Sequence, residues 1–352
     1  MQSPQKLHIS YRLPHLFGIQ RNSWQTSTEG GSNKKVTTIL LDWHVPTITD
    51  FDAAQTAAAV SHSLANDEAF SNIFLYSKKL GIQVAFYDGC LFRLYEPHPG
   101  DFFYAPPLGI DYADDSEQNA RHLAHALALL KADADAKQRR FKLILLTDDK
   151  KRLFELAAPR RFAYTENRDF ADYLYRTPLM ASLAGKKLQK KRNHVSHFMK
   201  THTDIHFEPL TEQNAKDAQY VEEQWFAENS GESSFDKIIE LEMIQTALQN
   251  RELLNLTGGV LYADGVPAAM TVGSRISPAA FDINFEKSYA PFDKDGAYTV
   301  VFNEFAKLLT EYEFINREED LGIEGLRKSK LSYQPALLLT KWQALENIDT
   351  ER

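Results

Sequence analysis

The sequence contains one cysteine, Cys90, among its 352 residues. A single thiol excludes an intrachain disulfide framework and any metal site built from several cysteines. Cys90 lies in the apolar run CLFRLY, so we interpret it as a packing residue and not as a nucleophile.

Long apolar runs are also missing. No stretch approaches the roughly 18 apolar residues that a membrane-spanning helix needs. The first residues lack the apolar segment of a signal peptide. We therefore expect a cytoplasmic protein without a transmembrane segment, whose contact with lipid is peripheral.

The common phosphate-binding and catalytic signatures are absent as well. The sequence has neither a Walker-type loop nor a G-x-G-x-x-G motif, and Ser182 and Ser196 lack the turn that exposes a nucleophilic serine. Several histidines lie between His194 and His206, but their spacing supplies no tetrahedral ligand set, so we expect no metal.

The composition is that of a folded globular protein, with 43% hydrophobic and 12% aromatic residues. A chain of this length is too long for one ordinary core, so two domains are expected. The formal net charge of -8 argues against general coating of nucleic acid. It favours a local basic patch for a specific anionic ligand.

Such a patch lies in residues 185–200, GKKLQKKRNHVSHFMK, and no acidic residue occurs in residues 173–203. The segment has no proline and only one glycine, at its start, so a helix is allowed. Leu188, Val195 and Met199 would form its apolar side. The remaining sides carry the candidate phosphate-binding residues, which are Lys186, Lys187, Lys190, Lys191, Arg192 and Asn193.

A lysine-rich helix can simply be a solvated surface. Surface helices usually alternate the signs of their charges, however, because opposite charges one turn apart stabilise the helix. A face of one sign carries repulsion that a docked anion relieves. Phosphates of a nucleotide, a nucleic acid or a lipid headgroup are the natural anions.

The chain runs through one series of elements twice. Each series predicts a strand, a helix, a hairpin, a strand, a long helix, a strand, a short helix and a last strand. The hairpins turn at Asp-Gly dipeptides, which are typical of tight turns between strands. The predicted elements, apart from the short helices, span residues 38–43, 52–65, 81–95, 102–105, 118–131, 141–147 and 162–164, and then 205–210, 215–228, 258–273, 280–285, 298–312, 313–316 and 336–342.

This duplication predicts an α+β fold with two tandem units, each a mixed sheet flanked by helices. We expect a polar extension at residues 1–35, a first domain at 36–175 and a second domain at 176–352. The basic helix would then lie at the junction, and clefts between domains are frequent ligand sites.

A second candidate site lies in the stretch INREEDLGIEGLRKSKLSY. A short strand ends near Asn316, and Glu318, Glu319 and Asp320 follow in a loop. Carboxylates at a strand end suit a general base or an ammonium-binding site, and burial of all three would raise the pKa of one of them. Arg327 would clamp a carboxylate or a phosphate. The alternative is a solvated acidic turn followed by a helix whose basic end suits its dipole.

Polar residues also alternate in the stretch DINFEK, at Asp282, Asn284 and Glu286. Alternation would place all three on one face of a strand. They would then line a cavity, or else form the solvent face of an edge strand.

Three stretches resemble a known family: DYLYRTPLMASLAGKKLQKKRNHVSHF, NFEKSYAPFDKDGAYTVVFNEF and INREEDLGIEGLRKSKLSYQP. They are similar to the C-terminal domain of phosphatidylglycerol lysyltransferases, and shorter echoes such as DEAFSNIFLY and YAPPLGID lie in the first half. The resemblance runs from about Val36 to Ala344. It implies a tandem pair of GNAT-like acyltransferase domains.

The resemblance further implies transfer of an amino acid from aminoacyl-tRNA to a lipid headgroup or, as in the related Fem-type ligases, to a peptidoglycan precursor. The expected function is that of a soluble aminoacyl- or acyltransferase without a tightly bound cofactor. Its donor would be aminoacyl-tRNA or acyl-CoA, and its acceptor a small molecule, a peptide or a lipid headgroup. The lysyltransferases also carry a membrane-embedded half, which we do not expect here.

On this hypothesis an acceptor amine or hydroxyl attacks an activated ester or thioester. Glu319 or Asp320 would deprotonate the acceptor or hold the ammonium group of the donor. The basic helix would bind the phosphates of tRNA. The expected substrate-binding residues are Asn284, Glu286, Asn316, Arg327 and Lys330.

Two other functions stay open at this point. A non-catalytic protein could bind nucleic acid or another anion through the basic helix, but it would gain nothing from three carboxylates at residues 318–320. A CoA-dependent N-acetyltransferase would cradle a pyrophosphate at residues 293–297. The sequence there, DKDGA, has one glycine and two acids, and acids repel a pyrophosphate.

Overall fold

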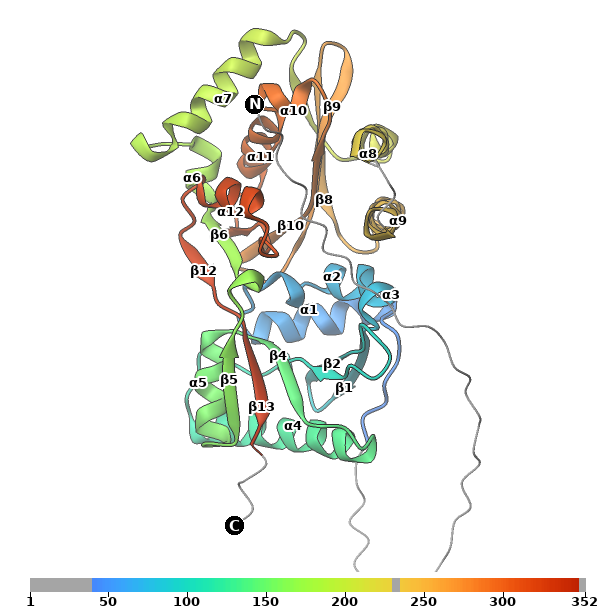
Figure 1. The fold of residues 1–352 in the computed structure, drawn as a ribbon, viewed down its shortest axis with the longest axis vertical. Coiled ribbons are helices and arrows are strands. Elements are labelled where there is room, and N and C mark those ends of the chain that lie inside the picture. Colours follow the sequence, from blue (N-terminus) through green and yellow to red (C-terminus); the bar gives the residue numbers. More distant parts are fainter. Residues whose placement is uncertain (1–39, 230–234, 348–352) are drawn as a thin grey trace, which may run out of the picture. The chain divides into compact units, whose positions relative to one another are not determined.

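The computed structural model describes residues 40–229 and 235–347 (Figure 1). The polar extension predicted at residues 1–35 lies outside these ranges. The described chain forms a six-stranded and a seven-stranded mixed sheet, both flanked by helices. The predicted α+β fold with two sheets is therefore confirmed.

The first sheet has the strand order β1-β2-β3-β4-β13-β5, with β3 and β4 parallel and the other neighbours antiparallel. Its strands are Gln83–Tyr87 (β1), Cys90–Tyr95 (β2), Phe103–Tyr104 (β3), Lys142–Leu146 (β4), Phe162–Glu166 (β5) and Trp342–Glu346 (β13). The helices of this half are Phe51–Val60 (α1), Phe70–Leu75 (α2), Ser77–Leu80 (α3), Glu117–Ala136 (α4) and Asp148–Ala157 (α5), with 3-10 turns at Ile48–Asp50, Asn66–Glu68 and Arg168–Phe170.

The second sheet has the order β12-β6-β11-β10-β9-β8-β7, with β10 and β11 parallel. Its strands are Asp172–Arg176 (β6), His206–Pro209 (β7), Thr257–Ala263 (β8), Val266–Arg275 (β9), Ala280–Ser288 (β10), Phe314–Asn316 (β11) and Leu337–Leu339 (β12). The helices are Thr177–Ser182 (α6), Gln189–Thr201 (α7), Ala215–Asn229 (α8), Phe235–Gln249 (α9), Phe292–Asp295 (α10), Ala297–Leu308 (α11) and Glu324–Leu331 (α12). Helices α8 and α9 cover one face of this sheet and α11 covers the other (Figure 1).

The two halves exchange a strand with each other. In both sheets a hairpin is followed by an antiparallel third strand and a parallel fourth strand. In each sheet the strand beside the fourth one comes from the other half of the chain. Strand β6, which follows β5 in sequence, lies between β11 and β12, and the C-terminal β13 lies between β4 and β5. The domain division between residues 175 and 176 stays a prediction, because each sheet contains a strand from the other side of it.

Both predicted hairpins form and turn where expected. Tyr87 pairs with Cys90, and Ala263 pairs with Val266, so each Asp-Gly dipeptide is a two-residue loop. Both residues of each dipeptide have a positive φ, between 50° and 79°. A type I′ turn requires this conformation, which glycine adopts without steric cost.

The strand predicted at residues 38–43 is wrong for its described part. Residues 40–43 form no strand, and His44 makes only an isolated bridge to Val84. The chain leaves the sheet edge here because Trp43 donates its indole N–H to Asp133 of α4, at 2.9 Å. A tertiary contact thus overrides the local strand preference.

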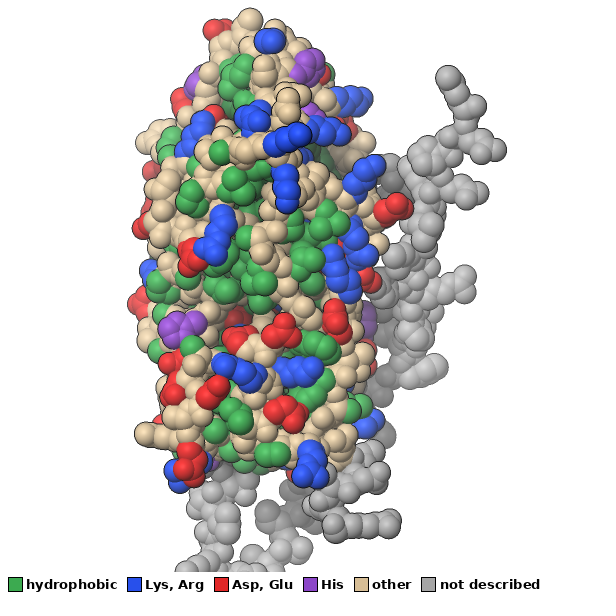
Figure 2. Space-filling model, turned by 90° about the vertical axis from the view of Figure 1, so that its left-hand side faces the viewer, with side chains coloured by type: hydrophobic (Ala, Val, Ile, Leu, Met, Phe, Trp, Pro, Cys, Tyr) green, Lys and Arg blue, Asp and Glu red, His purple; other side chains and the backbone are tan. Residues whose placement is uncertain are grey.

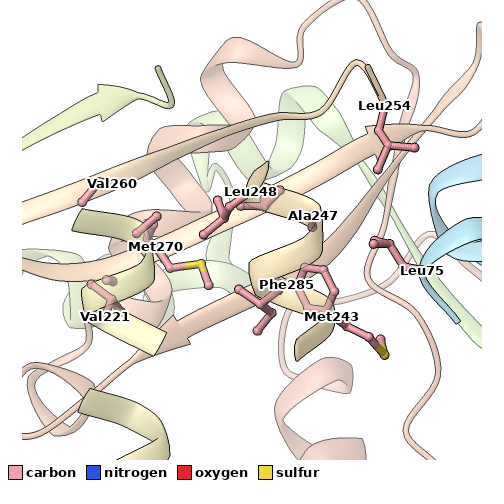
Figure 3. Close-up of a cluster of buried hydrophobic side chains, with 14 of the residues drawn as sticks. Leu75, Val221, Met243, Ala247, Leu248, Leu254, Val260, Met270 and Phe285 are labelled. Carbon is pink, nitrogen blue, oxygen red and sulfur yellow. The ribbon is translucent and has the colours of Figure 1, made fainter. Parts of the chain in front are cut away.

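One hydrophobic cluster joins the two halves. Leu75 of α2 belongs to the same buried cluster as Met243 and Ala247 of α9 and Phe285 of β10 (Figure 3). Burial of apolar side chains contributes about 25 cal/mol for each Å² removed from water. The segment around α2 is therefore fixed against the second sheet, although it belongs to the first half of the chain.

The strand exchange predicts the effect of a C-terminal truncation. Removing residues 341–352 deletes β13 from between β4 and β5 and leaves the buried position of Ala344 empty. We expect the shortened chain to lose cooperative thermal unfolding, measured by circular dichroism. A chain that ends at residue 347 is the control and should unfold cooperatively. Equal unfolding midpoints for the two chains would contradict the exchange.

Candidate functional site

Polar side chains from both halves meet where the chain crosses between the sheets. Strand β6 begins at Asp172, and the neighbouring β11 ends at Asn316. Strand β10 places Asp282 directly opposite Asn316. The first half adds Asn66, from the turn before α2, and Asn72, from α2 itself. All five side chains are buried.

Asp172 is the centre of a hydrogen-bond network. Its Oδ2 accepts from the backbone N–H of Asn66 at 3.0 Å and from the side-chain amide of Asn316 at 2.9 Å. Its Oδ1 lies 2.8 Å from Nζ of Lys341, which also pairs with Asp67. Burial opposes the charge of Lys341, but Asp172 and Asp67 raise its pKa well above the ordinary value. Burial and nearby carboxylates raise the pKa of Asp172 to about 6.

Asp282 is bound only by amides. Its Oδ2 accepts from Asn72 at 2.8 Å and from Asn284 at 2.9 Å, and its Oδ1 has no hydrogen-bond partner in the described chain. Asn284 also donates to Oδ1 of Asn72 at 2.7 Å, which fixes the position of both amides. Burial, together with repulsion from Asp172, raises the pKa of Asp282 well above its ordinary value.

The loop after β11 brings two more carboxylates to the same place. Asn66 donates to Oε2 of Glu319 at 3.1 Å, and the Asn72 amide lies 3.5 Å from Oε1 of Glu318. Both glutamates are half-buried. Burial and the charge of Asp282 raise the pKa of Glu318 well above its ordinary value.

We call Asp282, Glu318 and Glu319 the acidic cluster. Within residues 40–229 and 235–347, no Lys or Arg forms an ion pair with any of the three. The half-buried Tyr76, at the end of α2, faces the same carboxylates. Burial, with the charges of Glu318 and Glu319, raises the pKa of Tyr76 well above its ordinary value. The junction thus gathers carboxylates of which these three have no directly paired lysine or arginine in the described chain.

The predicted common face of Asp282, Asn284 and Glu286 is wrong at its last member. Strand β10 has a β-bulge between residues 283 and 285, and a bulge breaks the alternation of side chains. Glu286 therefore lies on the α11 side of the sheet, where Arg317 donates to its Oε1 at 2.6 Å. Asp282 and Asn284 remain together on the side that contacts α2.

Asp320 is held by cations and hydroxyls of the protein itself. Arg327 donates to both of its oxygens, at 2.9 Å and 2.7 Å, Arg168 donates at 3.2 Å and Tyr173 at 2.5 Å. These hydrogen bonds, led by those of Arg327, hold the pKa of Asp320 well below its ordinary value. Asp320 is therefore hydrogen-bonded mainly within the protein, and the catalytic role of Asp320 and the substrate-binding role of Arg327 stay predictions.

Lys330 is likewise hydrogen-bonded within the protein, and its predicted substrate-binding role stays a prediction. Its Nζ donates to the backbone carbonyls of Arg317, at 2.5 Å, and of Glu319. Burial lowers the pKa of Lys330. The buried lysine thereby fixes the backbone that carries the glutamates, in keeping with the need of buried carbonyls for a partner.

The basic segment folds as a 3-10 turn at Lys186–Leu188 followed by α7. Lysine and arginine side chains gather over the upper part of the face where α7 lies (Figure 2). Arg192 donates to the carbonyls of Leu183 and Gly185 and so caps α6, whereas Lys191 is buried. The predicted phosphate-binding residues that stay exposed are Lys186, Lys187, Lys190 and Asn193.

The apolar side of α7 differs from the prediction at one position. Met199 is 44% exposed, whereas the neighbouring Phe198 is fully buried. Leu188, Lys191 and Phe198 follow the helical period toward α10 and α11, against which α7 packs. The buried stripe therefore contains a lysine, which the hydrophobic pattern alone does not reveal.

Within residues 40–229 and 235–347 there is no ready-made metal site and no membrane-spanning helix. No three or more His, Cys, Asp or Glu side chains there are grouped closely enough to hold a metal ion. No helix among the described elements combines the length and apolar content needed to cross a bilayer.

The sequence pattern did not reveal Asn66, Asn72, Asp172, Arg317 and Lys341. All of them except Arg317 come from distant parts of the chain and meet where β6 enters the second sheet and α2 packs on α9. One signal was available for Asp172, which stands in the otherwise apolar and aromatic run DYLY. An aspartate in such a run is expected to be buried, and buried carboxylates have partners.

The two mixed sheets flanked by helices define a fold of the GNAT-like class, as predicted. Residues 59–345 match the family described as phosphatidylglycerol lysyltransferase, C-terminal, and the chain belongs to this family. No curated protein matches the sequence.

Several solved structures share this fold. A conserved protein of unknown function from Bacteroides thetaiotaomicron is 33% identical, with a TM-score of 0.80 over 88% of this chain and 100% of that chain. The C-terminal domain of a putative lysylphosphatidylglycerol synthetase from Agrobacterium fabrum is 15% identical, with a TM-score of 0.57 over 86% and 92%. FemX is 10% identical, with a TM-score of 0.55 over 86% and 97%. The last two likenesses concern the fold alone.

The acidic cluster predicts an unusual pH dependence of stability. Because burial raises the pKa of Asp282, the folded chain holds more protons than the unfolded chain above the ordinary aspartate pKa, so stability falls as the pH rises. Asp282→Asn should therefore raise the thermal unfolding midpoint by a few degrees at pH 8 and leave it unchanged at pH 3.

The matched control is Glu324→Gln, which removes an exposed carboxylate from the start of α12. It should shift the midpoint little at either pH. A lower midpoint for Asp282→Asn than for the unaltered chain at pH 8 would show that the charged carboxylate stabilises the fold. That result would contradict the assignment of an uncompensated cluster.

Proposed function

We propose that this protein transfers an amino acid from aminoacyl-tRNA to an amine or hydroxyl acceptor. The proposal is carried by one observation: Asp282, Glu318 and Glu319 are gathered at the junction of the sheets with no cation paired to them in the described chain. Membership of the family supports a transferase domain. The choice of donor and acceptor rests on the chemistry of the site.

An ammonium group is the ligand that best relieves such a cluster. Carboxylates brought together in a partly buried site repel one another, and a bound cation removes this cost. In an aminoacyl ester the α-ammonium is attached one carbon away from the reacting carbonyl. A site that holds the ammonium therefore also fixes the position of the carbonyl, which is how binding lowers the barrier to transfer.

The transfer breaks the ester bond to the terminal ribose of the tRNA and forms a new amide or ester bond. The lone pair of the acceptor attacks the acyl carbon, the acceptor loses a proton, and the ribose oxygen gains one as it leaves. A carboxylate with a raised pKa suits both proton transfers. Glu318 has this property, and we assign the ammonium to Glu319 with Asp282 behind it.

The exposed lysines of the basic segment supply the contact with the nucleic acid. Lys186, Lys187 and Lys190 form no ion pair within the described ranges. Their charges are therefore available for phosphates, and release of counterions makes such binding depend on salt. Asn193 lies one helical turn from Lys190 and adds an uncharged donor.

A CoA donor is less well supported. The loop between β10 and α11 forms the short helix α10, and Asp295 at its end lies 3.1 Å from Nε2 of His202. A Cβ added to Gly296 would lie 3.2 Å from the carbonyl oxygen of His194 in α7. The start of α11 is thus covered by α7 and bordered by acids. A pyrophosphate needs this end open and free of negative charge.

The site assignment predicts a separation of transfer from tRNA binding. Glu319→Gln removes the charge that holds the ammonium and should lower kcat/KM for transfer by about a hundredfold or more. Binding of uncharged tRNA should stay the same. The measurement is movement of radiolabel from mixed aminoacyl-tRNA into acid-soluble or lipid-extractable products, with a cell extract as the source of acceptors.

Replacement of Lys186, Lys187 and Lys190 by Ala should have the opposite effect. It should weaken binding of charged and uncharged tRNA alike and lower the slope of log affinity against log salt by roughly 0.7–0.9 for each lost phosphate contact. Glu324→Gln is again the control. Unchanged transfer in both Glu319→Gln and Asp282→Asn would show that the acidic cluster is not the site.

A further inference from the structure

A second group of charged side chains lies on the α11 side of β10, opposite the acidic cluster. Its first member is Lys191 of α7, which is 7% exposed. The Nζ atom of Lys191 lies 3.5 Å from the centre of the Tyr333 ring. No carboxylate or hydrogen-bond acceptor among residues 40–229 and 235–347 is within bonding distance of it. A buried ammonium group is costly unless its N–H groups find acceptors.

The second member is Arg317. Its guanidinium lies 4.1 Å from the centre of the Phe302 ring and 4.9 Å from that of Tyr333. It donates to Oε1 of Glu286, whose side chain is 7% exposed. The other oxygen of Glu286, Oε2, has no partner in the described chain. Lys191 and Arg317 therefore both lie over the ring of Tyr333, and Glu286 is paired with Arg317.

Among the described residues, Lys191 has no hydrogen-bond acceptor and Oε2 of Glu286 has no donor, whereas Arg317 is paired with Oε1 of Glu286. Two cations face one carboxylate, so the group carries a net positive charge, which is the reverse of the acidic cluster on the other side of the sheet. Burial, with the charges of Arg317 and Lys190, lowers the pKa of Lys191 to about 8. An anion bound between the two cations would supply acceptors for the N–H groups and reverse this destabilisation.

We propose that Lys191 and Arg317 form a binding site for one phosphate group, with Oε2 of Glu286 accepting a hydrogen bond from a hydroxyl beside that phosphate. The three N–H donors of Lys191 and the planar fork of Arg317 suit the several oxygens of a phosphate. The site also adjoins the exposed lysines of α7, so a chain of phosphates could continue onto the surface. This site does not depend on the proposed function. The proposed function concerns only the source of the phosphate, which is either a polynucleotide or a phospholipid headgroup.

The first test uses inorganic sulfate as the probe and needs no transfer activity. Sulfate keeps its charge between pH 7.5 and 9.5, and its binding is measured by calorimetry and by the rise in thermal unfolding midpoint. The charged groups that face Lys191 are Arg317, Glu286, Tyr333, Lys190 and His194. Burial lowers the pKa of His194, so this histidine is already neutral throughout the range.

The expected result is an affinity that falls about tenfold between pH 7.5 and 9.5, as Lys191 loses its proton. Lys191→Met, which keeps the length and removes the charge, should bind sulfate at least about tenfold more weakly and without pH dependence. The matched control is Lys190→Met, at the exposed neighbouring position. It should keep both the pH dependence and most of the affinity. Arg317→Lys, which retains the charge but not the fork, should give an intermediate loss.

Competition then identifies the source of the phosphate. Displacement of sulfate by a short RNA ending in CCA points to a polynucleotide, and displacement by phosphatidylglycerol vesicles points to a lipid headgroup. Sulfate binding that is equal in Lys191→Met and the unaltered protein would overturn the proposal, as would a failure of the unaltered protein to bind sulfate at all. Neither result depends on whether the acidic cluster supports transfer.

Discussion

The ion pair between Lys341 and Asp172 lies where the chain crosses between its two sheets. Asp172 is the first residue of β6, which enters the second sheet, and Lys341 directly precedes β13, which returns to the first. Removing one partner of a buried ion pair leaves an isolated charge and typically costs about 3–5 kcal/mol. This contact therefore ties the two exchanged strands together at the point where the halves meet.

The same crossing explains why a costly group of carboxylates can exist at all. Asn66 and Asn72 reach the second sheet because α2 is packed on α9, and their amides bind Asp172, Asp282 and Glu319 without neutralising them. Amide donors hold the carboxylates in place but supply no positive charge to pair with them. The junction is thus rigid in geometry and still deficient in positive charge, which is the combination that a cation-binding site needs.

The loop after β11 divides the charges of the site. The side chain of Arg317 lies on the α11 side of the sheet. The carboxylates of the next two residues, Glu318 and Glu319, lie on the α2 side. Nζ of Lys330 holds the backbone of this loop by donating to the carbonyls of Arg317 and Glu319. A ligand that carries both an ammonium and a phosphate could contact both sides, and an aminoacyl nucleotide is such a ligand.

Local features of this structure follow from the sequence, and long-range ones do not. The Asp-Gly turns fix both hairpins because two residues suffice to set the turn type, and the repeated order of elements indicates two mixed sheets. The exchange of β6 and β13 could not be predicted, because the sequence of a short strand does not indicate which strands it pairs with. The bulge before Phe285 moved Glu286 to the other face, and the burial of Lys191 depends on where Tyr333 lies. Each of these features depends on packing between segments that are distant in the sequence.

The most direct test of the ammonium site is proton release. An aminoacyl-adenosine with a stable amide link is titrated into the protein at pH 6.5, and the heat is compared in buffers of different ionisation enthalpy. Because a bound ammonium lowers the raised pKa values of Asp282 and Glu318, we predict net release of protons and tighter binding than for adenosine alone. Equal binding of the two compounds without proton release would contradict the account.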